Sequence, residues 1–225
     1  ADLLQRFEHI PGRYGWHAQH LEDNGTITEM EISRGLLNIA EGLQYMHNVK
    51  RRLHLNVTPE CIVITPGGQW KLCGFGFALS IQNDEFKIGI PYFMNATSNL
   101  LRLEPDLRYG APELTEGGLG TVHEVTPSAD VFSLGITAIE MYRYNLQYAS
   151  RGSCPPVLGV STNTVQDHHI AMRGLNSLDL SLVPHGMLQL ITGMTQYNMN
   201  ARISVSDIIT NPYFHTGNLA VLYLI

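Results

Sequence analysis

Apolar residues between Glu31 and His47 recur at steps of three and four positions, which is the spacing of one face of an α-helix. They are Ile32, Leu36, Leu37, Ile39, Ala40, Leu43 and Met46. The pattern predicts an amphipathic helix that packs its apolar face on a core. The segment before it, residues 1–28, carries Pro11 and several glycines and is interpreted as a short helix followed by a loop.

The pattern then changes to two short β-rich runs, Ile62–Thr65 and Gln69–Leu72, on either side of a Pro-Gly-Gly turn. This arrangement predicts a β-hairpin. Cys61 and Cys73 lie at equal distances from Gly67 at its centre, so we expect them to be cross-strand neighbours. We interpret them as two buried small apolar residues, with a redox or metal site as the alternative.

A second helix is predicted to begin near residue 128, where Pro127 suits a first turn and Thr126 and Ser128 are candidate caps. The positions that follow are apolar on most sides, which is typical of a buried central helix. They include Val131, Leu134, Ile136, Ala138, Ile139 and Met141. The stretch Tyr144–Thr164 contains glycine, adjacent prolines and several serines, and it is predicted to be a long surface loop able to hold a partner.

Composition limits the class of protein. With 225 residues, 44% of them hydrophobic and 15% charged, the chain can bury one sizeable core and is not a disordered tail. A net charge of −6 argues against binding to nucleic-acid phosphates, and no apolar run reaches the roughly 20 residues of a membrane helix. Three cysteines without a Cys-x-x-Cys spacing indicate reduced thiols in the cytoplasm.

Five motifs occur in a fixed order, and together they resemble the protein kinase family. They are His54–Ile62, Gly74-Phe75-Gly76, Ala111-Pro112-Glu113, Asp130–Gly135 and Ala201-Arg202-Ile203. In kinases these positions hold the catalytic loop, the Asp-Phe-Gly triplet, the Ala-Pro-Glu motif, a central helix and a late arginine.

The resemblance runs from about residue 28 to 216 and is to the large lobe of the kinase fold. It implies a mainly α fold (α+β overall) with small β-hairpins at the catalytic loop. It also implies a domain over residues 1–216, with residues 217–225 beginning a truncated following segment.

The resemblance does not extend to the catalytic chemistry. Asn56 stands where a kinase has its base aspartate, Thr58 replaces the loop lysine, and Cys61 and Gly74 replace the two metal ligands. A neutral amide takes up no proton near pH 7, and a soft sulfur suits a hard cation poorly. We therefore expect a pseudokinase with no catalytic residue, no metal site and no ATP or magnesium cofactor. The alternative is an active or atypical serine/threonine kinase that binds ATP.

The resemblance assigns structural roles to five residues: His54, Phe75, Glu113, Asp130 and Arg202. Glu113 and Arg202 are expected to form a buried ion pair that fastens the activation segment. Asp130 is expected to accept backbone N–H groups of the loop around Leu55 and Asn56.

One branch of the family fits best, the Scy-like pseudokinases and in particular their coated-vesicle-associated branch. The match is carried by Leu55–Glu60, Lys71–Gly76, Pro105–Glu113, Tyr213-Phe214 and Gly217–Val221. It implies a scaffold in clathrin-linked vesicle traffic whose partners are proteins such as coat or adaptor components. It further implies a cytoplasmic protein, peripheral on Golgi or endosomal vesicles, with no nucleic-acid partner and no transmembrane segment.

Only 53 residues precede His54, and they contain neither a Gly-x-Gly-x-x-Gly lid nor a Val-Ala-Ile-Lys motif. The small lobe is therefore predicted to be absent. A fragment or incomplete gene product is favoured over evolutionary loss of the lobe, because the final run Leu219–Ile225 is apolar and has no stop signal. A third interpretation is that the chain alone does not fold stably.

Overall fold

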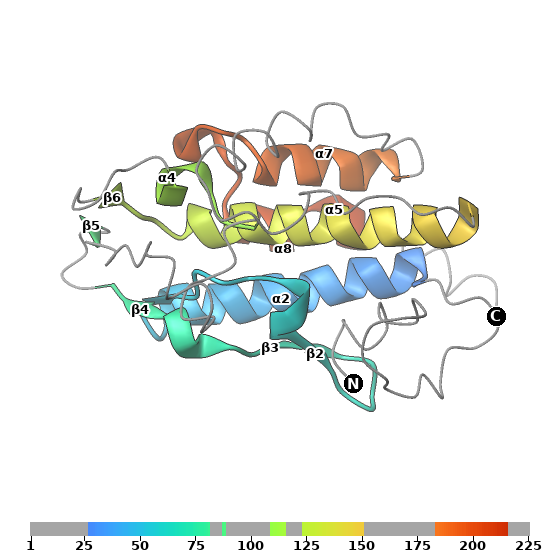
Figure 1. Cartoon of the computed structure of the whole chain (residues 1–225), viewed down its shortest axis with the longest axis horizontal. Helices are drawn as coiled ribbons and strands as arrows, with labels where there is room; N and C mark the ends of the chain where they lie inside the picture. The colour runs from blue at the N-terminus through green and yellow to red at the C-terminus, as the bar shows by residue number, and fades with distance from the viewer. Residues whose placement is uncertain (1–26, 82–86, 89–108, 116–122, 151–182, 216–225) are drawn as a thin grey trace, which may run out of the picture.

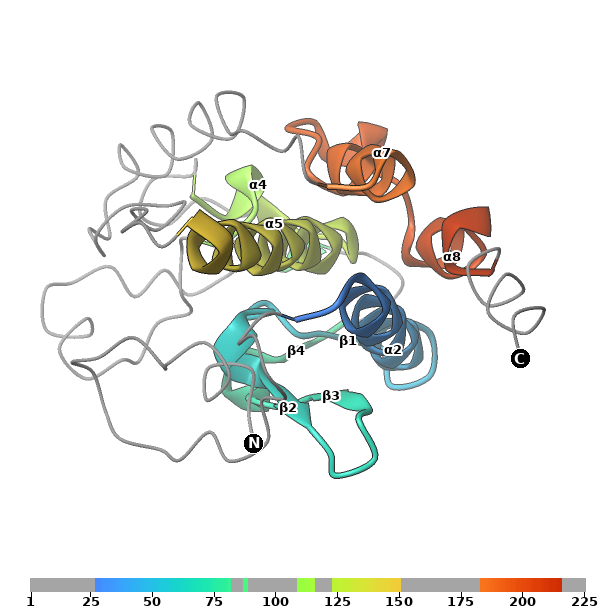
Figure 2. The ribbon, with the colours of Figure 1, turned by 90° about the vertical axis from the view of Figure 1, so that its right-hand side faces the viewer.

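The computed structural model describes residues 27–81, 87–88, 109–115, 123–150 and 183–215, and the statements below concern these residues. Three longer helices, α2 (Glu29–Asn48), α5 (Ser128–Ser150) and α7 (His185–Met194), run side by side, with α5 between the other two (Figures 1 and 2). The short α4 (Pro112–Thr115) lies near the start of α5, and α8 (Val205–Ile209) packs on α2. This helix-rich arrangement confirms the mainly α class.

Helix α2 begins at a capping box that its sequence encodes. Thr28 Oγ1 accepts a hydrogen bond from the Glu31 backbone N–H (3.2 Å), and the Glu31 carboxylate accepts one from the Thr28 N–H (3.0 Å). The predicted helix is confirmed and begins two residues earlier than Glu31. Its buried face meets Trp70 at Gly35, where a Cβ would lie 2.1 Å from the indole. Glycine is therefore required for this close packing.

The predicted hairpin is also confirmed. Strands β2 (Ile62–Ile64) and β3 (Trp70–Leu72) pair antiparallel, with Ile62 opposite Leu72. The Cys73 N–H donates to the Cys61 carbonyl at 2.8 Å, so the two cysteines are cross-strand neighbours, as their spacing predicted.

Two further antiparallel pairs are small. Strand β1 (Arg52–Leu53) pairs with β4 (Leu79–Ser80), and β5 (Lys87–Ile88) pairs with β6 (His123–Glu124). The described residues also include three 3₁₀ turns, η1 (Pro59–Cys61), η2 (Phe75–Phe77) and η3 (Met199–Ala201), and a helical turn over residues 212–215.

Helix α5 is the buried centre of the structure. Its positions from Ala129 to Ile139 are all buried, and those other than Gly135 are 0–2% exposed, as a central helix requires. The prediction of a loop from Tyr144 is wrong over residues 144–150, because the helix continues to Ser150. These seven residues contain no glycine or proline, and the first breaker in the sequence is Gly152. The remainder of that predicted loop, residues 151–164, lies outside the described residues.

A shared carboxylate ties the start of α2 to α5 and to the segment after α8. The Tyr142 hydroxyl donates to both oxygens of Glu29, at 2.8 and 2.7 Å, and the Tyr213 hydroxyl donates to the same carboxylate. Burial, followed by the hydrogen bond to Glu29, raises the pKa of both phenols, so both remain donors.

The expectations for residues 1–26 and 217–225 fall outside the described residues. Among the helices that the structure does describe, none is both long and apolar enough to cross a lipid bilayer.

Candidate functional site

The loop that carries His54, Leu55 and Asn56 is anchored by Asp130 in the first turn of α5. This carboxylate is fully buried, and it accepts hydrogen bonds from the backbone N–H groups of His54 (2.8 Å) and Leu55 (2.7 Å). His47 Nε2 lies 2.8 Å from the same carboxylate. A buried carboxylate must be hydrogen-bonded, and Asp130 has three such partners. Asp130 therefore fixes the loop to α5 and α2.

Asp130 was expected to accept backbone N–H groups of the loop around Leu55 and Asn56, and the two donors in that loop are His54 and Leu55. The Asn56 N–H donates to His54 Nδ1 at 3.3 Å. Leu55 has a left-handed backbone (φ 61°), which turns the chain between these groups. The contact with His47 was missed, and the one sequence signal for it is that His47 lies four residues after Leu43 on the apolar face of α2.

His54 links the loop to the end of β3. Burial is the main cause that lowers the pKa of His54, so the ring is neutral near pH 7. Its Nε2 lies 2.8 Å from the Cys73 carbonyl, which requires a hydrogen on Nε2 and leaves Nδ1 free to accept from Asn56. The ring also meets Phe75 edge-on, with centroids 5.2 Å apart. His54 and Phe75 therefore support the loop by packing and hydrogen bonding.

The structure brings Asn56, Cys61 and Gly74 together. Asn56 Nδ2 lies 3.4 Å from Cys61 Sγ, and a Cβ built on Gly74 would lie 2.5 Å from that sulfur. Gly74 has φ 77°, in the left-handed region that favours glycine. Burial raises the pKa of the Cys61 thiol, so it stays protonated. Thr58 is buried, and its carbonyl accepts from the Cys61 N–H at 3.0 Å.

This cluster presents an amide, a protonated thiol and a bare glycine, and none of these is a carboxylate. Magnesium in proteins is bound by carboxylate, phosphate and water oxygens, so the three residues do not fit a magnesium–triphosphate group. Over the described ranges, no three His, Cys, Asp or Glu side chains gather closely enough to hold a metal ion. The metal alternative for Cys61 and Cys73 thus lacks a third ligand among them.

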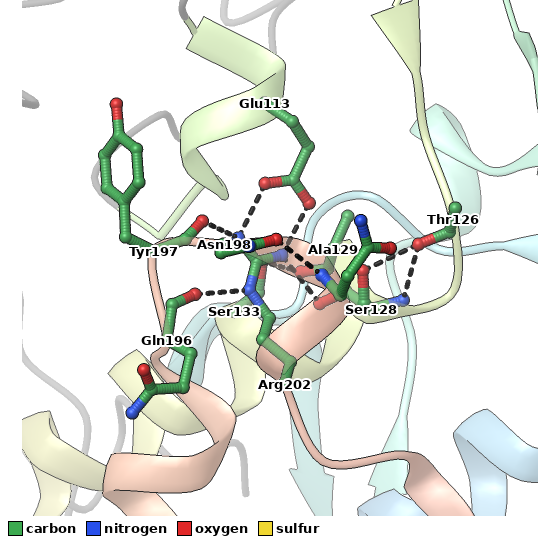
Figure 3. Close-up of polar contacts among 10 residues, drawn as sticks. Glu113, Thr126, Ser128, Ala129, Ser133, Gln196, Tyr197, Asn198 and Arg202 are labelled. Atoms are coloured by element: carbon green, nitrogen blue, oxygen red, sulfur yellow. Dashed lines mark hydrogen bonds and ion pairs between the residues drawn. The ribbon is translucent and has the colours of Figure 1, made fainter.

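Arg202 is the centre of a second polar cluster (Figure 3). Its Nη1 and Nη2 donate to the two oxygens of Glu113 at 2.5 and 2.7 Å, in a bidentate pair. The same guanidinium donates to the carbonyls of Gln196 (2.6 Å), Tyr197 (3.0 Å) and Ser128 (3.1 Å). The Arg202 side chain is 0% exposed and that of Glu113 is 14% exposed. One residue therefore joins α4, the start of α5 and the segment between α7 and η3.

The class of the protein follows from a family comparison. The family model for the protein kinase domain matches residues 6–214, and the chain therefore belongs to the protein kinase domain family.

The chain was also compared with individual curated proteins. The chain is 25% identical to the protein kinase domain-containing protein ppk32 of Schizosaccharomyces pombe over 219 residues, which cover 93% of this chain and 26% of that protein. It is 40% identical to SCY1-like protein 2 of Homo sapiens over 83 residues, which cover 37% of this chain and 8% of that protein. It is 27% identical to Aurora kinase of Schizosaccharomyces pombe over 199 residues, covering 87% and 46%. The chain thus spans less than half the length of each of these relatives.

Proposed function

We propose that this kinase-domain chain does not transfer phosphoryl groups and serves as a scaffold for protein–protein interaction. The observation that carries the proposal is the position of Cys61 Sγ, which fills the space beside Gly74 where a side chain at residue 74 would begin. A carboxylate at position 74 would require replacement of Gly74 and also a different residue at position 61.

The energetic consequence is large. General base catalysis contributes about 10²–10⁴-fold to a rate, and Asn56 cannot supply it. Charge stabilisation by a metal ion at the phosphates is worth several kcal/mol. Losing both removes on the order of 8 kcal/mol of transition-state stabilisation, or about six decades of rate.

The residues that hold the fold together do not depend on a nucleotide. Asp130 satisfies its carboxylate with two backbone N–H groups and His47, and Arg202 satisfies Glu113. The domain can therefore keep its shape without ATP, which is what a docking platform requires.

The likeness to SCY1-like protein 2 and to the protein kinase-like protein SCY1 of Saccharomyces cerevisiae supports the Scy-like assignment. On that basis we propose a cytoplasmic role in clathrin-linked vesicle traffic, peripheral on Golgi or endosomal vesicles. The partners would be coat or adaptor proteins. We do not expect the protein to bind nucleic acid.

A second candidate is a serine/threonine kinase with an atypical metal site. It is favoured by the likeness to Aurora kinase, which extends over 87% of this chain. This candidate requires Mg-ATP to bind beside Asn56 and Gly74.

The test is thermal denaturation of the chain with ATP, with magnesium, and with both. A ligand at 100 times its Kd stabilises the folded state by about 2.7 kcal/mol, so Mg-ATP binding would raise the Tm clearly. We expect no magnesium-dependent shift and no labelling of a generic substrate by γ-labelled ATP. ATP with a chelator is the matched control, because it keeps any binding that needs no metal. A magnesium-dependent shift accompanied by substrate labelling would establish the second candidate instead.

A further inference from the structure

Cys61 and Cys73 face each other across the hairpin, one residue beyond the paired part of each strand. The ladder of β2 and β3 ends with Ile62 opposite Leu72, and the next pair in the same register is Cys61 with Cys73. The Cys73 N–H donates to the Cys61 carbonyl at 2.8 Å, so the ladder continues through this pair. Both residues are thiols in the structure. The fold thus holds two thiols on directly opposite positions.

The backbone spacing of such a pair suits a disulfide. Directly opposite residues that share a hydrogen bond in an antiparallel pair have Cα atoms about 5.5 Å apart. Disulfides join Cα atoms that are about 4.4–6.8 Å apart. A bridge between Cys61 and Cys73 therefore needs rotation of the side chains and no change in strand register.

The Cys61 sulfur is held in its present position by weak contacts. It interacts with Thr58 and accepts a hydrogen bond from Asn56 Nδ2 at 3.4 Å, and sulfur is a weak acceptor. It lies in the space beside Gly74, the residue that follows Cys73. A rotation of the sulfur towards Cys73 gives up these contacts and empties the space beside Gly74.

We propose that Cys61 and Cys73 form a reversible dithiol–disulfide site whose oxidant is a low-molecular-weight disulfide such as oxidised glutathione. The Cys73 thiolate attacks one sulfur of the oxidant, which forms a mixed disulfide and releases one glutathione thiolate. The Cys61 thiol then loses its proton to water and attacks the Cys73 sulfur, which releases the second glutathione thiolate. The two cysteines lose two electrons, and one molecule of the oxidant gains them.

The order of the two steps follows from burial. Burial raises the pKa of the Cys61 thiol, which withholds the thiolate that the first attack needs. In the mixed disulfide the hairpin keeps the Cys73 sulfur opposite Cys61, so the second attack is intramolecular. The site is independent of whether the chain transfers phosphoryl groups, and it therefore goes beyond the proposed function.

The experiment incubates the whole chain at graded ratios of oxidised to reduced glutathione, quenches it with acid and blocks the remaining thiols with N-ethylmaleimide. The chain has three cysteines, so the reduced chain should take up three blocking groups and the bridged chain only one. Trypsin cuts after Arg52, Lys71 and Lys87, so the disulfide should join peptide 53–71 to peptide 72–87. An excess of reduced glutathione should separate them. Glutathione adducts without a linked pair, or a bridge to Cys154 instead, overturn the proposal.

The denatured chain is the reference for chance pairing. At one glutathione ratio, the linked pair should be favoured about tenfold or more in the native chain over the chain in concentrated guanidinium chloride, because the fold has already brought the thiols together. Cys73→Ser should abolish the linked pair, and Cys154→Ser is the matched control that should keep it. Equal formation in the native and denatured chains would overturn the site.

Two glycine variants test the movement of the Cys61 sulfur. Gly74→Ala places a methyl group 2.5 Å from the position of the reduced sulfur, so it should favour the disulfide about fivefold or more. Gly68→Ala is the matched control, because Gly68 has the same φ of 77° and no atom within 4 Å of its Cβ position. It should leave the equilibrium unchanged. Equal effects of the two variants, or a less favoured disulfide in Gly74→Ala, would overturn the proposal.

Discussion

Cys61 and Gly74 are complementary in shape: the sulfur of one lies 2.5 Å from where the other would carry its first side-chain atom. The two positions are thirteen residues apart, on either side of the β2–β3 hairpin, and the cross-strand register brings them together. The size of residue 61 therefore limits what residue 74 can be.

This relationship predicts the effect of Gly74→Ala. Gly68 has the same φ of 77° but open space around it, so Gly68→Ala should cost only the left-handed strain of about 1–2 kcal/mol. Gly74→Ala should cost about 1–3 kcal/mol more, because the new methyl group overlaps the sulfur. In a Cys61→Ala background that excess should shrink. Urea denaturation of the set measures it, and equal costs at the two glycines would refute the shape relationship.

Two glycines of α2 offer a second matched comparison. Gly35→Ala should destabilise the fold by about 1–3 kcal/mol, because its methyl group would lie 2.1 Å from the Trp70 ring. Gly42→Ala should stabilise it by about 0.5–1 kcal/mol, because the site is open and alanine favours the helix. Chemical denaturation should therefore give opposite signs for the same substitution, and a common sign would contradict the packing of Trp70.

Arg202→Lys tests the second polar cluster. Lysine keeps the charge but cannot make the bidentate pair with Glu113 and the three carbonyl contacts at once. We expect a loss of about 2–4 kcal/mol, because a largely buried carboxylate loses a partner. Arg34→Lys on the exposed face of α2 should change stability by less than about 0.5 kcal/mol. Similar denaturation midpoints for the two variants would mean that charge alone is sufficient.

His54 predicts a dependence of stability on pH. Burial holds its folded pKa below the ordinary value of 6.5, so the unfolded chain binds the proton more readily. Its contribution to stability is therefore present above pH 6.5 and is lost as the pH falls from 6.5 toward the lower folded pKa. His54→Gln should flatten this part of the curve of unfolding free energy against pH. If the slope of the variant between pH 7.5 and 5.5 matched that of the parent chain, His54 would not be the group responsible.

Much of the fold could be predicted where the signal was local. The three- and four-residue spacing gave α2 to within two residues at its start, and the Pro-Gly-Gly turn gave the register of β2 and β3. The end of α5 was predicted too early. Within the predicted loop, glycine and proline occur only after Ser150, but that loop also included residues 144–150, which contain neither and form helix.

The site was predictable only through motifs that resemble a family. The pair of Glu113 with Arg202 and the contact of Asp130 with Leu55 followed from that resemblance. The contact of His47 with Asp130 joins residues 83 positions apart; the spacing from Leu43 places His47 on the apolar face of α2, but no local pattern identifies Asp130 as its partner. A hollow lined by Tyr45, Arg52, Lys71 and Phe75 likewise combines four separate elements, α2, β1, β3 and η2, so it emerges only from the packing.

The Arg202 cluster also constrains how the chain is made. Its guanidinium reaches Glu113 across 89 positions and the Ser128 carbonyl across 74, and the arginine comes after both. During synthesis from the N-terminus, α4 therefore cannot be fastened until residue 202 has left the ribosome. A product that stops before Arg202 would leave the Glu113 carboxylate without its cationic partner. We expect proteases to cleave such a product at the unfastened α4.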